Sequence, residues 1–165
     1  MHVTLRLCPD VWNLRSRRCF QVLQHAFQAG CQQFGVRIIH FSVQGNHIHL
    51  IVEAPDPAAL AQAMKGLKIR MALGLKKLMD RRGPVFSDRY HQHVLKTPRE
   101  AAVAVRYVLD NWKVHARREG WPIPKGVDPY CSAAPRDHGP RLVADPAWWL
   151  LCVGAERFQT KERAA

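Results

Sequence analysis

The sequence predicts an α+β fold of the ferredoxin-like split β-α-β kind, in which an antiparallel sheet carries two helices on one face. Three observations support this fold class. Short segments alternate between apolar and polar residues, two longer segments repeat apolar residues at steps of three and four, and Gly45-Asn46 marks a tight turn between two alternating segments. The predicted order is strand, helix, strand, strand, helix, strand, followed by an additional C-terminal helix and an extended tail.

The first two predicted elements are a strand and a helix. Residues 2–8 alternate, as expected of a strand with one buried face. Ser16 then precedes apolar residues at helical spacing, so we expect it to be the N-cap of a helix that continues to Phe34. Gly35 follows immediately, and we expect it to end this helix as its C-cap.

A hairpin is predicted next. Residues 36–44 alternate, Gly45-Asn46 forms the turn, and residues 47–54 return as the second strand. Because side chains along a strand point to alternate faces, one face of the sheet is apolar and packs on the two helices. We expect that face to hold Val3, Leu5, Ile39, Phe41, Ile48 and Leu50, and the opposite polar face to hold His40, Ser42, Gln44, His47 and His49.

The second half of the chain predicts a long helix, a strand and a third helix. Apolar residues recur at helical spacing from residue 60 to residue 78, and residues 85–96 are expected to form a fourth strand. Thr97 then begins a helix as a threonine cap, with proline next and glutamate three residues after the cap. This helix should reach residue 115 or 118 and cover the polar face of the sheet. We divide the chain into a domain at 1–118 and a tail at 119–165 that wraps over it.

The motif His47-Ile48-His49 indicates a metal site. On a strand the two imidazoles share one face while Ile48 points into the core, and imidazoles at this spacing can hold one divalent cation. The sheet face that carries them is the one not needed for the core. The motif therefore places a predicted metal site beneath the third helix.

A tyrosine nucleophile is predicted on that helix. Tyr107 and Asn111 lie one turn apart, away from the apolar stripe of their own helix, and so share a second face. Beside a divalent ion a phenol can attack a phosphodiester, and the resulting phosphotyrosine conserves the bond energy, so that a strand can be rejoined. The structural alternative is a tyrosine whose hydroxyl bonds a backbone group. Tyr90 and Tyr130 lack a metal-ligand residue type at helical spacing, so Tyr107 is the preferred candidate.

The charge of the chain favours a nucleic-acid partner. Lys and Arg number 25 against 13 Asp and Glu, which gives a formal net charge of +12. Residues 65–99 concentrate this charge, as expected of a surface that binds phosphates without reading sequence. We interpret the second histidine pair, at 91 and 93, as facing DNA rather than a metal. The predicted DNA-binding residues are Lys65, Lys68, Arg70, Lys76, Arg82, Arg89, Tyr90, His91, His93 and Lys96.

The cysteines and the hydropathy argue against two classes of protein. The five cysteines are odd in number, widely spaced and without a CxxC pair, which disfavours both a zinc ribbon and a disulfide framework. The sequence contains no apolar stretch of about 18 residues and no targeting segment. We therefore expect a cytoplasmic protein that does not contact a membrane.

These motifs resemble those of the single-tyrosine HUH transposases, and most of all the REP-associated tyrosine transposases, over roughly residues 2–118. The resemblance is clearest in the segments SVQGNHIHLIVE, FSDRYHQHVLKT and RYVLDNWKVH. It implies that 1–118 is the catalytic domain, that His47 and His49 are metal ligands and that Tyr107 is the nucleophile. Asn111 is implied as the residue that completes the metal site, with His115 on the same face as a rival.

The implied metal is Mg²⁺ or Mn²⁺, although two histidines alone also suit softer ions. The resulting hypothesis is a metal-dependent endonuclease and strand transferase that acts on single-stranded or hairpin DNA through a covalent 5′-phosphotyrosine, as a monomer or a homodimer. Two rivals stay open. A domesticated relative that binds DNA hairpins without cutting predicts salt-sensitive binding that survives the loss of His47. A metal phosphoesterase on small substrates predicts turnover without a protein–DNA adduct.

Overall fold

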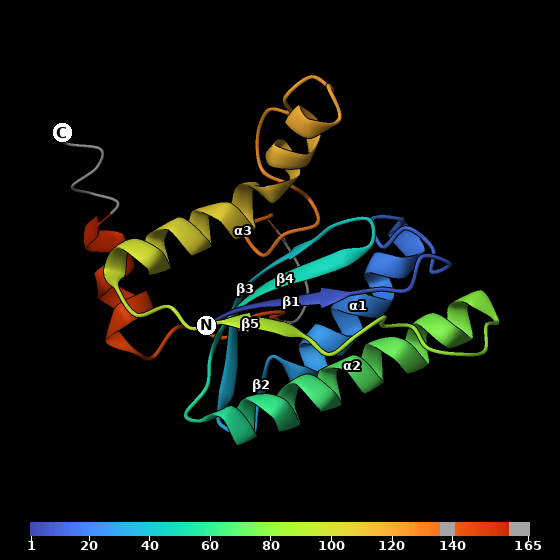
Figure 1. Ribbon diagram of the computed structural model, residues 1–165, viewed down its shortest axis with the longest axis horizontal. Helices are drawn as coiled ribbons and strands as arrows, with labels where there is room; N and C mark the ends of the chain where they lie inside the picture. The colour runs from blue at the N-terminus through green and yellow to red at the C-terminus, as the bar shows by residue number, and fades with distance from the viewer. Residues whose placement is uncertain (136–140, 159–165) are drawn as a thin grey trace.

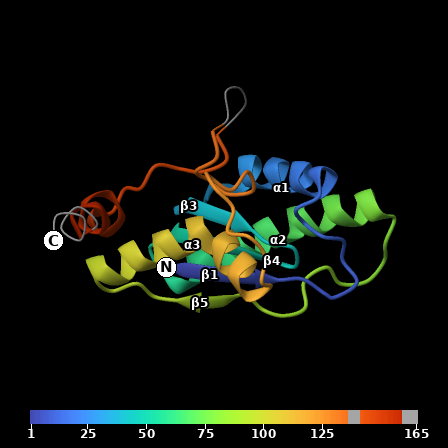
Figure 2. The same cartoon turned by 90° about the horizontal axis from the view of Figure 1, so that it is seen from above.

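The computed structural model describes residues 1–135 and 141–158 and has the predicted α+β architecture. A five-stranded antiparallel sheet of order β2-β3-β4-β1-β5 forms the central layer. Helices α1 and α2 cover one face and α3 covers the other (Figure 1, Figure 2). The elements are β1 (His2–Arg6), α1 (Arg17–Gly30), β2 (Gln32–Gln33), β3 (Val36–Val43), β4 (His47–Glu53), α2 (Pro57–Met79), β5 (His91–His93), α3 (Pro98–Arg118) and the short π-helix η1 (Leu150–Gly154). Apart from the short β2, this is the predicted ferredoxin-like order.

Helix α1 begins where the sequence predicts and ends early. The Ser16 hydroxyl accepts a hydrogen bond from the Cys19 amide, as an N-cap does. The helix ends at Gly30 rather than Phe34, and the prediction of Gly35 as its C-cap is wrong. Phe34 and Gly35 have positive φ values, 54° and 72°, and form the tight turn between β2 and β3. A two-residue hairpin turn of type I′ needs positive φ at both positions, and asparagine or glycine would have signalled such a turn more clearly than phenylalanine does.

A β-bulge in β3 changes which side chains face the main core. The register with β4 shifts between Ile38 and His40, so Ile39 is an extra residue in the ladder. Phe41 belongs to the core beneath α1 and α2 as predicted, but Ile39 points to the opposite face and packs under α3. The prediction that Ile39 and Phe41 share a face is therefore wrong, because strict alternation does not survive an inserted residue.

The second half of the chain departs from prediction mainly in its strand. The strand expected over 85–96 is reduced to β5, which pairs only with the first residues of β1. Phe86 makes an isolated bridge to Leu7, and the chain between this bridge and β5 is irregular. All three residues of β5 are exposed, so no side chain of this short strand is buried in the core. Helix α3 follows as predicted, because the Thr97 hydroxyl accepts a hydrogen bond from the Glu100 amide.

Two apolar clusters hold the layers together. The larger lies between the sheet and helices α1 and α2, where Phe27 stacks on Phe41 with ring centroids 4.3 Å apart. The smaller lies beneath α3 and consists of Ile39, Ile51, Leu95, Ala104 and Val108. Helix α3 therefore has its own apolar seat on the polar face of the sheet. Within residues 1–135 and 141–158, no helix is long and apolar enough to cross a bilayer.

The chain after α3 returns to the sheet and runs beside β3. The backbones of Tyr130 and Ser132 form hydrogen bonds with β3. Between them, Cys131 forms an isolated β-bridge with Ser42. Asp128 is fully buried and accepts two hydrogen bonds of 2.8 Å from the guanidinium of Arg15, which precedes α1. These contacts fasten the described part of the tail to the sheet. The division of the chain at residue 118 into a domain and a tail stays a prediction.

Candidate active site

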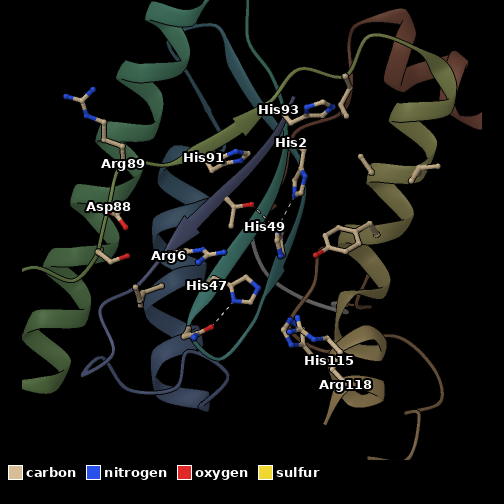
Figure 3. A pocket seen from close by; sticks show the side chains of 18 of the residues that line it. His2, Arg6, His47, His49, Asp88, Arg89, His91, His93, His115 and Arg118 are labelled. Carbon is tan, nitrogen blue, oxygen red and sulfur yellow. Dashed lines mark hydrogen bonds between the residues drawn. The ribbon is translucent and has the colours of Figure 1, made fainter. Parts of the chain in front are cut away.

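A cleft lies between α3 and the sheet face that α3 covers (Figure 3). Its sheet side is formed by β1, β4 and β5, and Figure 3 shows His115 and Arg118 of α3 on the opposite side. Histidines and arginines dominate its lining. These residues are His2, Arg6, His47, His49, Arg89, His91, His93, His115 and Arg118, together with Tyr107.

The two histidines of β4 point into this cleft side by side. The ring centroids of His47 and His49 are 4.8 Å apart, with the rings nearly perpendicular at 87°. Bonds between a metal and an imidazole nitrogen are about 2 Å long, so rings at this separation are close enough to share one ion. His47 Nδ1 lies 2.8 Å from Asn46 Oδ1, which requires Nδ1 to carry the proton and leaves the lone pair on Nε2.

His49 is held more tightly than His47. Its Nδ1 lies 3.0 Å from His2 Nε2 and 3.2 Å from Thr4 Oγ1. Its Nε2 is buried and has no hydrogen-bond partner. One nitrogen of the ring is thus surrounded by possible partners, while the other is left available to a ligand.

Both β4 histidines are neutral at physiological pH. Burial, with the nearby charges of His115 and Arg6, lowers the pKa of His47 to about 4. Burial, together with the neighbouring His47 and His2, lowers the pKa of His49 to about 3. A neutral imidazole is the form that binds a metal ion, so protons do not compete for these nitrogens near pH 7.

Tyr107 brings its ring to the same place from α3. The ring centroid lies 5.4 Å from that of His49 and 5.9 Å from that of His2, in edge-to-face geometry. The residue is 40% exposed and lines the cleft. Its position follows from the N-cap at Thr97 and the apolar seat at Val108, which set the rotation of the helix over the sheet.

Asn111 and His115 follow Tyr107 at successive turns of α3 and differ in placement. Asn111 is fully buried, is not among the residues that line the cleft, and has no hydrogen-bond partner for either its amide nitrogen or its oxygen. His115 lines the cleft, with its ring 5.3 Å from that of His47. A buried amide without partners costs about 1–3 kcal/mol, which is unusual unless a ligand satisfies it.

Two of the buried atoms that lack partners are of types that suit a divalent cation. His49 Nε2 and the Asn111 amide oxygen are both buried and unpaired, and both are ligand types for divalent ions. Within residues 1–135 and 141–158 no three His, Cys, Asp or Glu side chains are grouped so that they could hold a metal ion.

The structure brings together only some of the predicted DNA-binding residues. Arg89, His91 and His93 line the cleft. The side chains predicted on α2 do not, because α2 covers the opposite face of the sheet (Figure 1). Lys68 instead donates a 2.8 Å hydrogen bond to the carbonyl of Asp88 and lies over the ring of Phe86. Lys65, Arg70, Lys76, Arg82, Tyr90 and Lys96 are likewise absent from the lining of the cleft.

Among the histidines and arginines that line the cleft, three were not predicted as site residues. His2 and Arg6 are on β1, where alternation places them on the polar face with Thr4. Arg118 ends α3. The signal for β1 was present in the alternation, but only the pairing of Thr4 with His49 and of Arg6 with His47 shows that this strand lies beside the histidine motif.

A histidine pair on a strand and a tyrosine on the helix above it thus meet on one face of a ferredoxin-like sheet. This is the arrangement of an HUH-type transposase. The chain belongs to the IS200-like transposase family, because the family model described as "Transposase IS200 like" matches residues 11–111. The resemblance inferred from the motifs is thereby confirmed, and the chain is a DNA-processing enzyme of the transposase class.

Two solved structures match the chain. A REP-associated tyrosine transposase bound to a REP hairpin matches with a TM-score of 0.55 at 16% identity, over 73% of this chain and 68% of that one. A putative transposase from Deinococcus radiodurans R1 matches with a TM-score of 0.48 at 14% identity, over 64% of this chain and 85% of that one. The first likeness agrees with the fold described above. No curated protein matches the chain.

Proposed function

We propose that this transposase is a metal-dependent single-stranded DNA endonuclease and strand transferase that acts on hairpin DNA through a covalent 5′-phosphotyrosine at Tyr107. One observation carries the proposal. The Tyr107 ring, 40% exposed, lies 5.4 Å from the ring of His49 in a cleft that both residues line. A nucleophile and a metal ligand this close can act on one phosphate group.

His47, His49 and Asn111 are the proposed metal ligands. The unpaired Nε2 of His49 and the unpaired amide of Asn111 support this assignment, since each is a buried ligand-type group without a hydrogen-bond partner among the described residues. When bound, Mg²⁺ or Mn²⁺ would polarise the scissile phosphate and stabilise the charge that develops on it. Three protein ligands leave coordination positions for water and for phosphate oxygens.

The chemistry of the tyrosine conserves the phosphodiester. Tyr107 Oη forms a bond to phosphorus and gives up its proton to water, which reaches the open cleft. The P–O3′ bond breaks, and the departing 3′ oxygen takes up a proton to become a 3′-hydroxyl. A 3′-hydroxyl can later attack the phosphotyrosine, which restores a phosphodiester and the free tyrosine.

The size and charge of the cleft support a nucleic-acid substrate. Its volume of about 1210 Å³ exceeds the roughly 300–1,000 Å³ of pockets for small ligands, which disfavours a small phosphoester. Arg6, Arg89 and Arg118 line it, and one guanidinium group can bind two phosphate oxygens at once. The similar transposase was solved with a REP hairpin, and we extend that class of substrate to this chain.

The proposed active site needs one chain only. The two β4 histidines, Tyr107 and Asn111 all belong to the same copy, so cleavage by a monomer is the simpler proposal. A homodimer would have to form for another reason, such as holding two DNA ends.

The test is adduct formation on a hairpin oligonucleotide with single-stranded flanks and a label at its 3′ end. Palindromes from the DNA that flanks the gene supply candidate hairpins. With Mn²⁺, the wild-type protein should carry the label through denaturing electrophoresis, because the 5′ phosphate of the downstream fragment is attached to tyrosine. Tyr107→Phe should abolish the adduct, whereas Tyr130→Phe, at a tyrosine outside the cleft, is the matched control and should retain it.

Each other outcome has a distinct meaning. An adduct that persists in Tyr107→Phe would remove Tyr107 as the nucleophile. Hairpin binding without any adduct, unchanged in His47→Ala, would instead support the alternative function of a hairpin-binding protein that does not cut DNA.

A further inference from the structure

Strand β1 places two polar side chains against the same nitrogen of His49. Thr4 lies directly opposite His49 in the antiparallel pairing, and its Oγ1 is 3.2 Å from His49 Nδ1. His2 reaches the same nitrogen diagonally, with its Nε2 3.0 Å away (Figure 3). Both residues precede residues 11–111, the range that the family match covers, so the family match assigns them no role.

These two contacts determine where the proton of the His49 ring resides. A neutral imidazole carries one N–H and one lone pair. With the proton on Nδ1, the ring donates to His2 Nε2 or to Thr4 Oγ1, and the lone pair of Nε2 faces the proposed metal. With the proton on Nε2, a buried N–H would have no acceptor, because no hydrogen-bond partner is near that atom among the described residues.

The same His2 ring also touches the proposed nucleophile. Its centroid lies 5.9 Å from that of Tyr107 at an interplanar angle of 68° and 5.1 Å from that of His49. His2 thus contacts both rings, and a change at His2 alters the support of both. Ligand histidines commonly need such an outer partner to fix the orientation and the tautomer of the ring.

We propose that His2 is a positioning residue, which accepts the Nδ1 proton of His49, so that Nε2 can bind the metal, and which supports the ring of Tyr107. Thr4 is the second acceptor for the same proton. This inference rests on the proposed function only in that His49 is taken as a metal ligand. The protonation state of His49 can also be measured without any metal.

The first measurement is the binding of Mn²⁺ by calorimetry without DNA. The His2→Ala/Thr4→Val double variant should bind Mn²⁺ about 10–100-fold more weakly than wild type, which is the usual effect of losing an outer partner. Replacing His2 by glutamine instead of alanine should restore most of the Mn²⁺ affinity, because the glutamine side-chain oxygen can accept the same proton. His25→Ala removes an exposed histidine of α1 and should bind as wild type does.

The second measurement is the ¹⁵N spectrum of the histidine side chains in metal-free protein. Wild type should show His49 protonated on Nδ1, and the double variant should show a mixture of the two tautomers. The single variants Thr4→Val and His2→Ala serve if the double variant fails to fold.

The outcomes separate this inference from the proposed function. If wild type and His49→Ala both fail to bind Mn²⁺, the metal site is overturned, and the ¹⁵N spectrum alone decides the role of His2. If wild type binds, His49→Ala does not, and the double variant binds like wild type, then His2 and Thr4 do not position His49. A wild-type spectrum with His49 protonated on Nε2 would also overturn the inference.

Discussion

Replacing Asp128 by asparagine is expected to destabilise the fold by about 2–4 kcal/mol. The Asp128 carboxylate is fully buried and accepts two hydrogen bonds of 2.8 Å from Arg15 and one of 3.0 Å from the Tyr130 amide. Asparagine removes the charge and turns an NH₂ group toward the guanidinium. Breaking a buried ion pair costs about 3–5 kcal/mol. We lower that figure because the Arg15 side chain is 25% exposed and can recover part of its hydration.

Thermal and urea unfolding measure this loss. For a chain of this length about 1 kcal/mol corresponds to about 2–4 °C, so the midpoint should fall by about 4–16 °C. Asp145→Asn is the matched control, because Asp145 accepts the same two-bond contact from Arg141 with both side chains more than two-thirds exposed. It should leave stability unchanged. Equal losses in the two variants, or no loss in Asp128→Asn, would refute the argument that burial makes the Asp128 pair important.

Three further predictions concern pH, DNA and helix α3. Burial lowers the pKa values of His47 and His49 to about 4 and about 3. Between about pH 6.5 and pH 4 the unfolded chain therefore binds protons that the folded chain does not, so metal-free protein should lose stability as pH falls through this window. The His47→Gln/His49→Gln variant should lose less stability over this pH window, as measured by urea unfolding at its two ends. In hairpin-binding assays, the slope of log affinity against log salt concentration should be smaller by about 1 in Arg89→Ala. Lys76→Ala, on the far face of the sheet, should reduce this slope less. Equal effects of the two variants would show that DNA also contacts α2. Thr97→Ala should cost about 1 kcal/mol in thermal unfolding through loss of the N-cap, and no change would mean that packing alone starts α3.

Much of the fold could be predicted because its signals are local. The caps at Ser16 and Thr97 and the hairpin turn at Gly45-Asn46 depend on neighbours in the sequence, and the structure has all three. The early end of α1 could not be predicted, because Phe34 takes a positive φ that is unfavourable for its residue type. The shortness of β5 follows from what it pairs with, which no pattern within 85–96 reveals.

The proposed active site was predictable to the extent that it depends on periodicity. His47 and His49 share a strand face, and Tyr107 lies on the exposed side of a capped helix, so both patterns predicted their approach. The stretch of positive charge is continuous in sequence but not in space. Its first half is in α2 on one side of the sheet, and only its second half, with Arg89, reaches the cleft. The contact of His2 with His49 depends on strand register, which a single sequence does not provide.

The extra residue in β3 separates the packing of this strand against α1 and α2 from its packing against α3. On either side of Ile39 the side chains that face α1 and α2 keep a two-residue period, and the insertion shifts the phase by one. A chain shortened by that residue would bring Ile38 and Phe41 into uninterrupted phase and would lose only the apolar contact under α3. The face of the sheet beneath α3 can therefore gain or lose a residue while the side chains on the other face keep their alternation. An alignment of β3 with a strand that lacks this residue needs a gap here, or half of the strand is placed on the wrong face.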